Sequence, residues 1–588
     1  MTQLAKAATG LLGEFHARGL LGWAGVHAAT KWGWLYGERD ELALLGAAAA
    51  VQALQHGSTC LDLGRAAEQL PASTDQDDLD GLEFPEAQVW QAALESSPLV
   101  SVGVHAPSGP PLRLVSGLLY LQRYWAEEQR VEQRLQELRA AAPLPAEGLR
   151  PILDGLFPPG SDPDQRLAAA VGALSRLTVI AGGPGTGKTH TIARLIAAWQ
   201  QLHRGGRIAL AAPTGKAAAR MLESLQTAAG ELPTHLQEGL AGIAPTTIHR
   251  LLGWSPAGRM VFTHDALNPL PFALVVIDEA SMVSLTLMSR LLAALPPNGQ
   301  LVLVGDPEQL TSVEAGAVLA DIAELPLGSP SLDAMLASLS EPPSPTGALV
   351  RLRHNHRSGG TQVDAAARAV QAADAAELGR LAEAADGVFL LDPEDPASEE
   401  RLRALVLAAA LPAIAAARDA DGPAALAELR RHQILCAHRE GRWGVSHWGA
   451  RAQSWIAAAA GIPAFGLFPG QPLIYTANSP EFGLSNGDPG VVIRRGGELL
   501  GYFGPAEIPA ELLHQADPAF AFTVHKAQGS QFEAVSLILP PPESPLANRE
   551  LLYTALTRAE RQAYLFGSEA ALSRCVEHRA VRASGLAR

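Results

Sequence analysis

GGPGTGKTHT, residues 182–191, follows the apolar run LTVIA at 177–181 and precedes the helix-forming run IARLIAAWQ at 192–200. This order predicts a buried strand, a glycine loop and the start of a helix. The pattern G-x-x-x-x-G-K-[ST] begins at Gly182 and ends at Thr189. In such a loop the backbone N–H groups and the helix N-terminus surround phosphate oxygens. The chain is therefore predicted to bind a nucleoside triphosphate.

Two side chains of this loop have predicted roles of their own. The ammonium of Lys188 is expected at the outer phosphates, and the hydroxyl of Thr189 is expected to ligate Mg²⁺. The alternative, a glycine-rich turn without a ligand, fits the strand, loop and helix context less well. The loop residues predicted to bind the nucleotide are Gly182, Gly183, Pro184, Gly185, Thr186, Gly187, Lys188, Thr189 and His190.

Length and composition limit the class of protein. A chain of 588 residues, at about 150 residues per domain, predicts three or four domains. The net charge of −15 argues against nucleic-acid binding through bulk positive charge, so any DNA contact must be local. Three cysteines without CxxC spacing favour a reducing compartment. The longest apolar stretch, 404–417, contains Pro412 and is shorter than the roughly 20 residues of a membrane span. We expect a cytoplasmic protein that does not bind membranes.

Breaks in composition divide the chain into three blocks. A Pro/Ala-rich segment at 140–145 ends the first block, 1–145, and a Pro/Ser-rich interval at 325–347 ends the second, 146–345. The third block, 346–588, contains a β-like stretch around 466–518 with Asn-Gly and Gly-Gly turn signals. No repeat with a fixed period is present.

Polar residues follow two further apolar runs of the second block. Asp278-Glu279 follows ALVVI at 273–277, and GDPEQL at 305–310 follows LVLV at 301–304. A carboxylate at the C-terminal end of a parallel strand faces the ligand crevice. Asp278 is thus a candidate Mg²⁺ ligand and Glu279 a candidate base for the attacking water. Gln309 is a candidate sensor of the γ-phosphate and the water; alone, each motif also fits an ordinary strand exit.

In this order and spacing, the motifs over residues 160–565 resemble superfamily 1 helicases, and most closely the RecD family. The fold class that this resemblance implies is α/β: two RecA-like P-loop motor domains with parallel sheets, a mostly helical N-terminal domain, and a small β insertion in the second motor domain. By the same resemblance Gln165 reads adenine, which implies ATP. APTGKAAAR at 212–220 resembles a motif that meets the DNA backbone, although Lys216 and Arg220 also fit a solvated helix face.

The third block carries the late motifs of that family. LRHNHRS at 352–358 resembles the motif that directs an arginine, here Arg357, at the γ-phosphate. AFTVHKAQGSQFE at 521–533 resembles the motif that couples DNA to nucleotide. LLYTALTRAER at 551–561 resembles the helix with an arginine finger, here Arg558. The predicted catalytic residues are thus Lys188, Asp278, Glu279, Gln309, Arg357 and Arg558.

The resemblance also implies an activity and partners. It implies an ATP-dependent 5′ to 3′ DNA helicase subunit that assembles with RecB and RecC homologues at DNA ends, with the N-terminal block docked on RecC and DNA cutting assigned to RecB. Trp443, Trp448 and Tyr475 are candidates for stacking on DNA bases, or else core residues. Two other functions stay open: a free-standing helicase of the same superfamily, and a P-loop ATPase switch that does not move on DNA.

Overall fold

The computed structural model describes residues 9–70, 82–203, 205–254, 262–312, 314–344, 346–356, 361–463, 465–479 and 481–586. Four sheets organise these residues, and two of them are entirely parallel. Among the described helices, none combines the length and the apolar character that crossing a bilayer requires. The predicted α/β class with two parallel sheets is confirmed.

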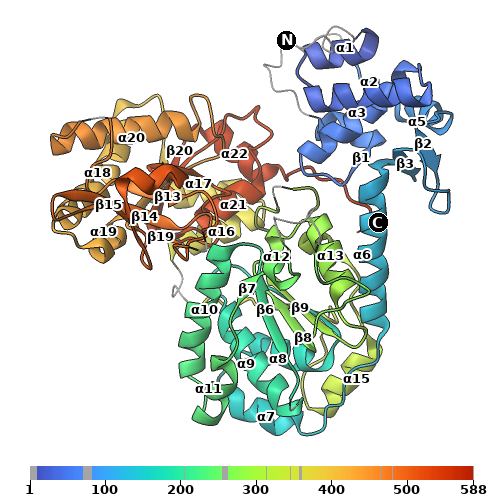
Figure 1. Ribbon diagram of the computed structural model, residues 1–588, viewed down its shortest axis with the longest axis horizontal. Helices are drawn as coiled ribbons and strands as arrows, with labels where there is room; N and C mark the ends of the chain where they lie inside the picture. The colour runs from blue at the N-terminus through green and yellow to red at the C-terminus, as the bar shows by residue number, and fades with distance from the viewer. Residues whose placement is uncertain are drawn as a thin grey trace.

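The N-terminal region combines helices with a small sheet (Figure 1). The strand order is β1-β4-β3-β2, in which only the β2–β3 pair is parallel. Helices α2 and α3 pack on each other, and Trp90 of α5 is fully buried beside them. The elements are α1 Gly10–Ala17, α2 Trp23–Tyr36, α3 Glu41–Gln55, β1 Cys60–Asp62, α4 Ala66–Gln69, α5 Ala87–Glu95, β2 Val100–Val102, β3 Leu112–Val115, β4 Leu118–Leu121 and α6 Gln122–Ala140.

The first parallel sheet has six strands in the order β10-β5-β9-β8-β6-β7. Its inner strands are apolar runs without alternation, as expected for strands that helices cover on both faces. The elements are α7 Leu149–Leu156, α8 Pro163–Leu174, β5 Leu177–Ala181, α9 Lys188–Leu202, β6 Ile208–Ala212, α10 Gly215–Gly230, α11 Thr234–Ala241, β7 Thr246–Thr247, α12 Ile248–Leu251, β8 Leu274–Ile277, α13 Leu285–Ala294, β9 Gln300–Gly305, α14 Val318–Glu324, α15 Pro330–Ser338 and β10 Leu349–Arg351.

The second parallel sheet has five strands in the order β11-β20-β19-β12-β18. Helices α16 and α21 pack on each other and contact β20. The elements are α16 Gln362–Gln371, α17 Ala375–Ala384, β11 Val388–Leu391, α18 Pro396–Arg418, α19 Gly422–Leu429, β12 His432–Cys436, α20 Val445–Ala460, β18 Ala521–Thr523, β19 Phe532–Ile538, α21 Arg549–Leu556, β20 Ala559–Phe566 and α22 Glu569–Glu577.

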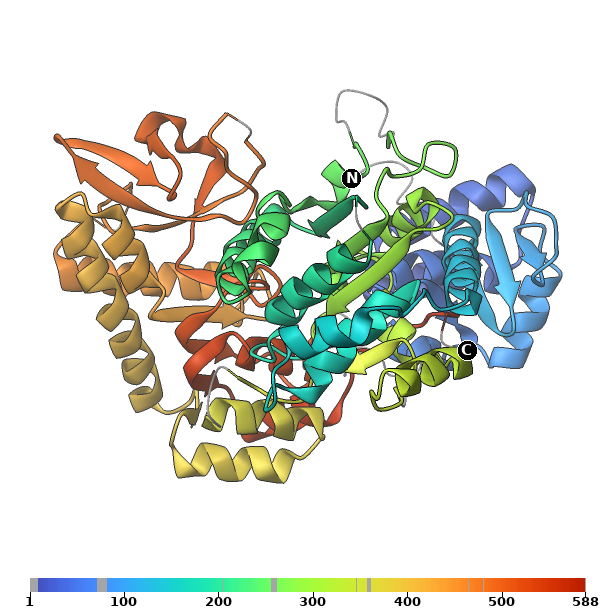
Figure 2. The ribbon, with the colours of Figure 1, turned by 90° about the horizontal axis from the view of Figure 1, so that it is seen from below.

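Between α20 and β18 the chain forms a separate antiparallel sheet, the predicted β insertion. Its order is β16-β15-β14-β13-β17, with β13 Pro472–Tyr475, β14 Pro489–Arg495, β15 Glu498–Tyr502, β16 Glu507–Pro509 and β17 Ala516–Pro518. Figure 2 shows this insertion on the side of the molecule opposite the N-terminal region. We call the elements of the first parallel sheet, α7 to β10, the first motor, and those of the second parallel sheet, α16 to α22, the second motor, after the predicted motor domains. The loop that precedes β14 lies close to α10 of the first motor, since a Cβ at Gly215 would lie 2.1 Å from the Ser485 hydroxyl.

Two elements pack across the block boundaries that composition indicated. Strand β10 joins the first sheet beside β5, although it follows residue 345. Helix α6 precedes residue 145, yet Val131, Leu135 and Leu138 lie in a core shared with α13 of the first motor. Proline and serine clusters mark loops, whereas membership of a domain depends on which apolar faces are buried together.

The segment after α22 returns to the N-terminal region (Figure 1). The Ser58 hydroxyl accepts from Ala583 N at 3.1 Å, and Thr59 N donates to Ala583 O at 2.9 Å. The buried Glu128 accepts from Gly585 N at 3.1 Å. Leu586 then enters the core of the first motor, where it is buried. The second motor, the N-terminal region and the first motor are therefore joined by one extended segment.

Candidate nucleotide-binding site between the two parallel sheets

The phosphate loop joins β5, which lies between β10 and β9 in the first sheet, to α9. Every residue of β5 is buried, and Gly187 caps α9 in a left-handed conformation with φ of 77°. Such a φ favours glycine because a Cβ would be strained there. A Cβ on Gly187 would also lie 2.4 Å from Nε2 of Gln165. Glycine at this position is therefore required by backbone conformation and by space.

Lys188 folds back over its own loop. Its Nζ donates to the carbonyl oxygens of Gly182 at 2.7 Å and Gly183 at 3.2 Å. The Thr186 hydroxyl donates to Gly183 O at 2.8 Å, a further hydrogen bond within the loop. The loop is thus held by its own side chains next to the N-terminus of α9, where backbone N–H groups favour anions.

A cavity of about 450 Å³ opens above this loop. The first sheet supplies the loop, the two acidic residues after β8 and Gln309, while the second sheet supplies residues of the β18–β19 turn and Arg558. The lining residues are Gly183, Pro184, Gly185, Gly187, Lys188, Thr189, His190, Ala217, Arg220, Met221, Ser224, Thr227, Ala228, Glu231, Asp278, Glu279, Gln309, His356, Gly529, Gln531 and Arg558.

The predicted acidic pair lies at this cavity directly after β8. Burial and the neighbouring Glu279 raise the pKa of Asp278 to about 6, while the Lys188 ammonium opposes this. Glu279 has φ of 51° and ψ of 40°, a left-handed conformation that is rare outside glycine. Such backbone strain persists where the surrounding structure imposes it, and it is concentrated at functional sites.

Gln309 reaches the same cavity from the segment after β9. It is buried, and its Nε2 donates to Oδ2 of Asp306 at 3.1 Å. Burial raises the pKa of Asp306 above its usual value, although the Lys188 ammonium and the groups that donate hydrogen bonds to Asp306 oppose this effect. The structure therefore brings Lys188, Asp278, Glu279 and Gln309 to one wall.

The opposite wall carries Arg558, which is 3% exposed. The sequence places it on a helix, but α21 ends at Leu556 and Arg558 lies in the turn before β20. Its Nε donates to Thr554 O at 3.1 Å, and its Nη1 donates to Ser530 O at 3.4 Å. These contacts fix the guanidinium, and burial lowers its pKa. Arg558 thus lines the same cavity as the phosphate loop.

The Arg220 side chain lines the same cavity as Arg558 and joins the two motors. It starts from α10 of the first motor, and its Nη1 donates to Gly529 O at 2.6 Å and its Nη2 to Gln531 Oε1 at 2.7 Å. Lys216 is half-buried, bonds the Ser530 hydroxyl at 2.5 Å, and has its pKa lowered to about 8 by burial. The alternative of a solvated helix face does not hold for these two side chains, because both contact residues of the second motor.

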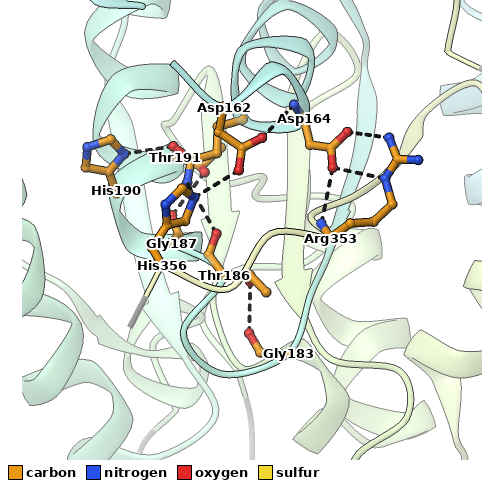
Figure 3. A network of polar contacts seen from close by, with 10 residues as sticks. Asp162, Asp164, Gly183, Thr186, Gly187, His190, Thr191, Arg353 and His356 are labelled. Atoms are coloured by element: carbon orange, nitrogen blue, oxygen red, sulfur yellow. Dashed lines mark hydrogen bonds and ion pairs between the residues drawn. The ribbon is translucent and has the colours of Figure 1, made fainter. Parts of the chain in front are cut away.

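Gln165 lies beside the cavity on α8, where it is 3% exposed. Its Nε2 donates to Thr186 O at 3.3 Å and contacts His356 Nε2 at 3.0 Å, and its Oε1 contacts His190 Nδ1 at 3.0 Å. His356 also pairs with Asp162 at 2.9 Å (Figure 3). The Gln165 amide is therefore engaged by protein groups, and it is absent from the cavity wall.

The segment that leaves the first sheet passes over this network. His356 N donates to Gly185 O of the phosphate loop at 2.8 Å, and Arg353 pairs with Asp164 at 2.7 Å (Figure 3). Arg357 follows directly but lies outside the described residues, so its predicted contact with the γ-phosphate stays a prediction. Nothing in the sequence singles out His356 beyond its place in LRHNHRS.

Two of the three candidate stacking residues belong to the core. Trp448 packs against Phe566 at a centroid distance of 5.0 Å, and the Tyr475 hydroxyl donates to Gln515 Oε1 at 2.9 Å. Both side chains are buried. Trp443 is half-buried, with Arg442 over its ring. Of the two alternatives, the core position is therefore the one found for Trp448 and Tyr475.

Three family models match separate parts of the chain. The N-terminal domain of the RecBCD enzyme subunit RecD matches residues 20–120. An AAA domain matches residues 165–315, which include the phosphate loop, the acidic pair and Gln309. A UvrD-like helicase C-terminal domain matches residues 518–566, which include Arg558. The phosphate-loop wall of the cavity and Arg558 thus fall within two different family models.

Relatives align over almost the whole chain. The RecBCD enzyme subunit RecD of Mycobacterium tuberculosis is 41% identical over 99% of this chain and 97% of its own. That of Mycolicibacterium smegmatis is 42% identical over 96% of each. The ATP-dependent RecD2 DNA helicase of Deinococcus radiodurans is 31% identical, over 67% of this chain and 47% of its own. With this identity over nearly its full length, the chain belongs to the RecD family of superfamily 1 helicases.

Proposed function

We propose that this chain is the ATP-dependent 5′ to 3′ DNA helicase subunit of a RecBCD-type helicase–nuclease that acts at double-strand DNA ends in repair and degradation. One observation carries the proposal: a single cavity joins the phosphate loop and acidic pair of one parallel sheet to Arg558 of another. A P-loop switch needs only the first wall, so the second wall favours a motor. The match of residues 20–120 to the RecD N-terminal domain favours a complex subunit over a free-standing helicase.

The chemistry needs positive charge where the transferring phosphoryl group gains negative charge. Lys188 and Arg558 supply it from the two walls of the cavity. Glu279 would orient the attacking water and take its proton, and Gln309 would contact the water and the γ-phosphate. These roles extend the family resemblance and rest on the position of each side chain at the cavity.

We propose ATP as the nucleotide and Mg²⁺ as its metal. Asp278 and Thr189 both line the cavity, and the hard oxygen donors they offer are those that Mg²⁺ prefers. The raised pKa of Asp278 supports this fit, since a cation beside two crowded carboxyl groups would stabilise their charged forms. When bound, the ion neutralises phosphate charge. Gln165 contacts His190 and His356, and both histidines line the cavity. Gln165 would therefore influence the selection of adenine by positioning these two side chains.

Closure of the two sheets would couple hydrolysis to movement. Arg220 and Lys216 link the two sheets beside the cavity. If the nucleotide completes its site only in the closed arrangement, each cycle of hydrolysis opens and closes the two motors. DNA lying across both motors would then be moved in one direction. We assign the motors to residues 146–345 and 346–588, with β10 and α6 packed on the first.

The isolated full-length chain is expected to hydrolyse ATP faster with single-stranded DNA and to unwind a duplex with a 5′ overhang in preference to a 3′ one. Direction follows from the family resemblance, and stimulation follows from the two-sheet site. Steady-state ATPase assays and strand displacement on both substrates measure these effects. No DNA stimulation, alone or with RecB and RecC homologues, would favour the switch, and preference for the 3′ overhang would contradict the polarity.

We further propose that the N-terminal region, residues 1–145, docks on the RecC homologue in a complex with RecB. Among the tryptophans of this region, Trp90 is a core residue whereas Trp34 is 81% exposed. Trp34 lies on α2 next to Leu35 and Tyr36, which are also exposed. Exposed aromatic clusters of this kind are typical of interface anchors. A cytoplasmic location stays a prediction from the cysteine content.

Replacing Trp34 with alanine is expected to weaken co-purification with RecB and RecC homologues at least about 10-fold, because a buried aromatic anchor contributes about 2 kcal/mol or more. DNA-stimulated ATPase of the chain alone should not change, since α2 lies in the N-terminal region, away from the nucleotide cavity. Phe465→Ala is the matched control, as this aromatic is 91% exposed on the second motor. If Trp34→Ala and Phe465→Ala are retained equally in the complex, the docking surface does not include Trp34. Substitution is preferable to deleting 1–140, which would remove α6 from the first motor's core.

A further inference from the structure

Tyr553 of the second motor inserts into the first motor next to the phosphate loop. It lies on α21, is 3% exposed, and donates its hydroxyl to Oδ2 of Asp306 at 2.9 Å. A Cβ on Gly183 would lie 2.9 Å from the same hydroxyl. The Tyr553 side chain therefore lies against the phosphate loop on one side and contacts the segment after β9 on the other.

Asp306 joins this tyrosine to the predicted sensor. The oxygen that accepts from Tyr553 also accepts from Nε2 of Gln309 at 3.1 Å. The second carboxylate oxygen, Oδ1, accepts from Glu308 N at 3.1 Å. Because the Gln309 NH₂ group is directed at Asp306, its carbonyl oxygen is the end of the amide that remains to accept from water in the cavity. The orientation of Gln309 thus depends on one buried carboxylate shared between the motors.

The residue after Gln309 is held from the same side. Leu310 N donates to the Thr554 hydroxyl at 2.7 Å, and Leu310 O accepts from Gln528 Nε2 at 2.7 Å. Both partners belong to the second motor and both are buried. The segment from Asp306 to Leu310 therefore forms three side-chain hydrogen bonds with the second motor, two of them with neighbouring residues of α21.

We propose that Tyr553 is a positioning residue that, through Asp306, orients the Gln309 amide toward the attacking water when the two motors close. This inference rests on the proposed ATP-driven motor and adds a residue to it. Opening the motors would withdraw the hydroxyl and leave the shared oxygen of Asp306 with Gln309 as its one remaining side-chain donor. The Gln309 amide would then be free to turn, and hydrolysis would slow until closure restores the contact.

Tyr553→Phe in the full-length chain tests the proposal, because it removes one oxygen and keeps the ring. We expect kcat of DNA-stimulated ATP hydrolysis to fall about 10- to 100-fold, as for loss of a hydrogen bond to a charged group. KM for ATP and equilibrium ATP binding should change less than about twofold, since the loop contacts remain. Tyr564→Phe is the matched control: this buried hydroxyl bonds Gln562 within β20, at 3.1 Å.

A double-substitution cycle separates positioning from general packing. If Tyr553 acts through Gln309, the chain with Tyr553→Phe and Gln309→Ala should be as slow as Gln309→Ala alone, within about twofold. Losses that multiply would overturn the proposal, and so would a Tyr553→Phe variant with more than half of the wild-type kcat. Should Tyr553→Phe not fold, Asp306→Asn, which replaces the shared acceptor at constant size, is expected to give the same selective loss of kcat.

The wild-type chain separates the two levels of inference. If it shows DNA-stimulated ATPase while Tyr553→Phe and Asp306→Asn behave as wild type, the positioning role fails and the motor stands. If the wild-type chain and its complex with RecB and RecC homologues show no DNA-stimulated ATPase, the proposed motor fails, and the positioning role fails with it.

Discussion

Replacing Lys188 with glutamine is expected to abolish ATP hydrolysis and DNA unwinding while the fold is retained. The Lys188 ammonium lies at the phosphate loop, where it bonds two loop carbonyls, and no other lysine lines the described cavity. Glutamine keeps the length of the side chain approximately but removes the charge that phosphate oxygens require. ATPase should fall below about a tenth of wild type, a loss of more than about 1.4 kcal/mol in transition-state stabilisation.

Steady-state ATPase and thermal unfolding of the same preparation check this result. Lys31→Gln on α2 is the matched control, because this lysine is exposed in the N-terminal region. Activity above a tenth of wild type in a folded Lys188→Gln chain would rule out the assigned role. A large drop in melting temperature would instead indicate that the loop contacts of Lys188 stabilise the fold.

Replacing Arg558 with alanine is expected to reduce single-turnover hydrolysis about 10³-fold or more, equivalent to about 4 kcal/mol, while ATP binding stays nearly normal. The expected split follows from geometry, since Arg558 reaches the cavity from the second parallel sheet and the phosphate loop reaches it from the first. An arginine that stabilises only the transferring phosphoryl group affects the rate and spares binding.

Two further variants complete this experiment. Arg561→Ala, whose side chain is 74% exposed, controls for loss of positive charge nearby. Arg558→Lys keeps a charge but loses the planar donor geometry, so it should fold and remain slow. Arg558 is buried and its Nε donates to Thr554 O. If Arg558→Ala and Arg558→Lys both lose ATP binding and hydrolysis rate in parallel, Arg558 is a structural residue.

Local sequence was sufficient for the first wall of the site. The phosphate loop, Asp278-Glu279 and Gln309 each follow an apolar run, and parallel strands place their C-terminal ends along one edge. Chain direction and strand order alone bring these residues together. The α/β class was predicted from the family resemblance. The β insertion was predicted from its β-like sequence and turn residues.

Only the tertiary structure decided what meets this wall. The Tyr553–Asp306 contact joins residues 247 positions apart, and the Arg220–Gly529 contact joins residues 309 positions apart. Periodicity reports which face of a helix is apolar, but not which distant surface covers it. Arg220 and Lys216 therefore fit a solvated face in sequence, although both are half-buried against the second motor.

The sequence by itself determined the nucleotide loop, the acidic pair and the family, because each depends on residues that are adjacent in the chain. The tertiary structure decided that α6 belongs to the first motor's core, that the final segment joins three regions, and that Arg558 faces the loop. These features depend on burying apolar faces from distant segments together. That choice is made by packing of the whole chain, and no local pattern contains it.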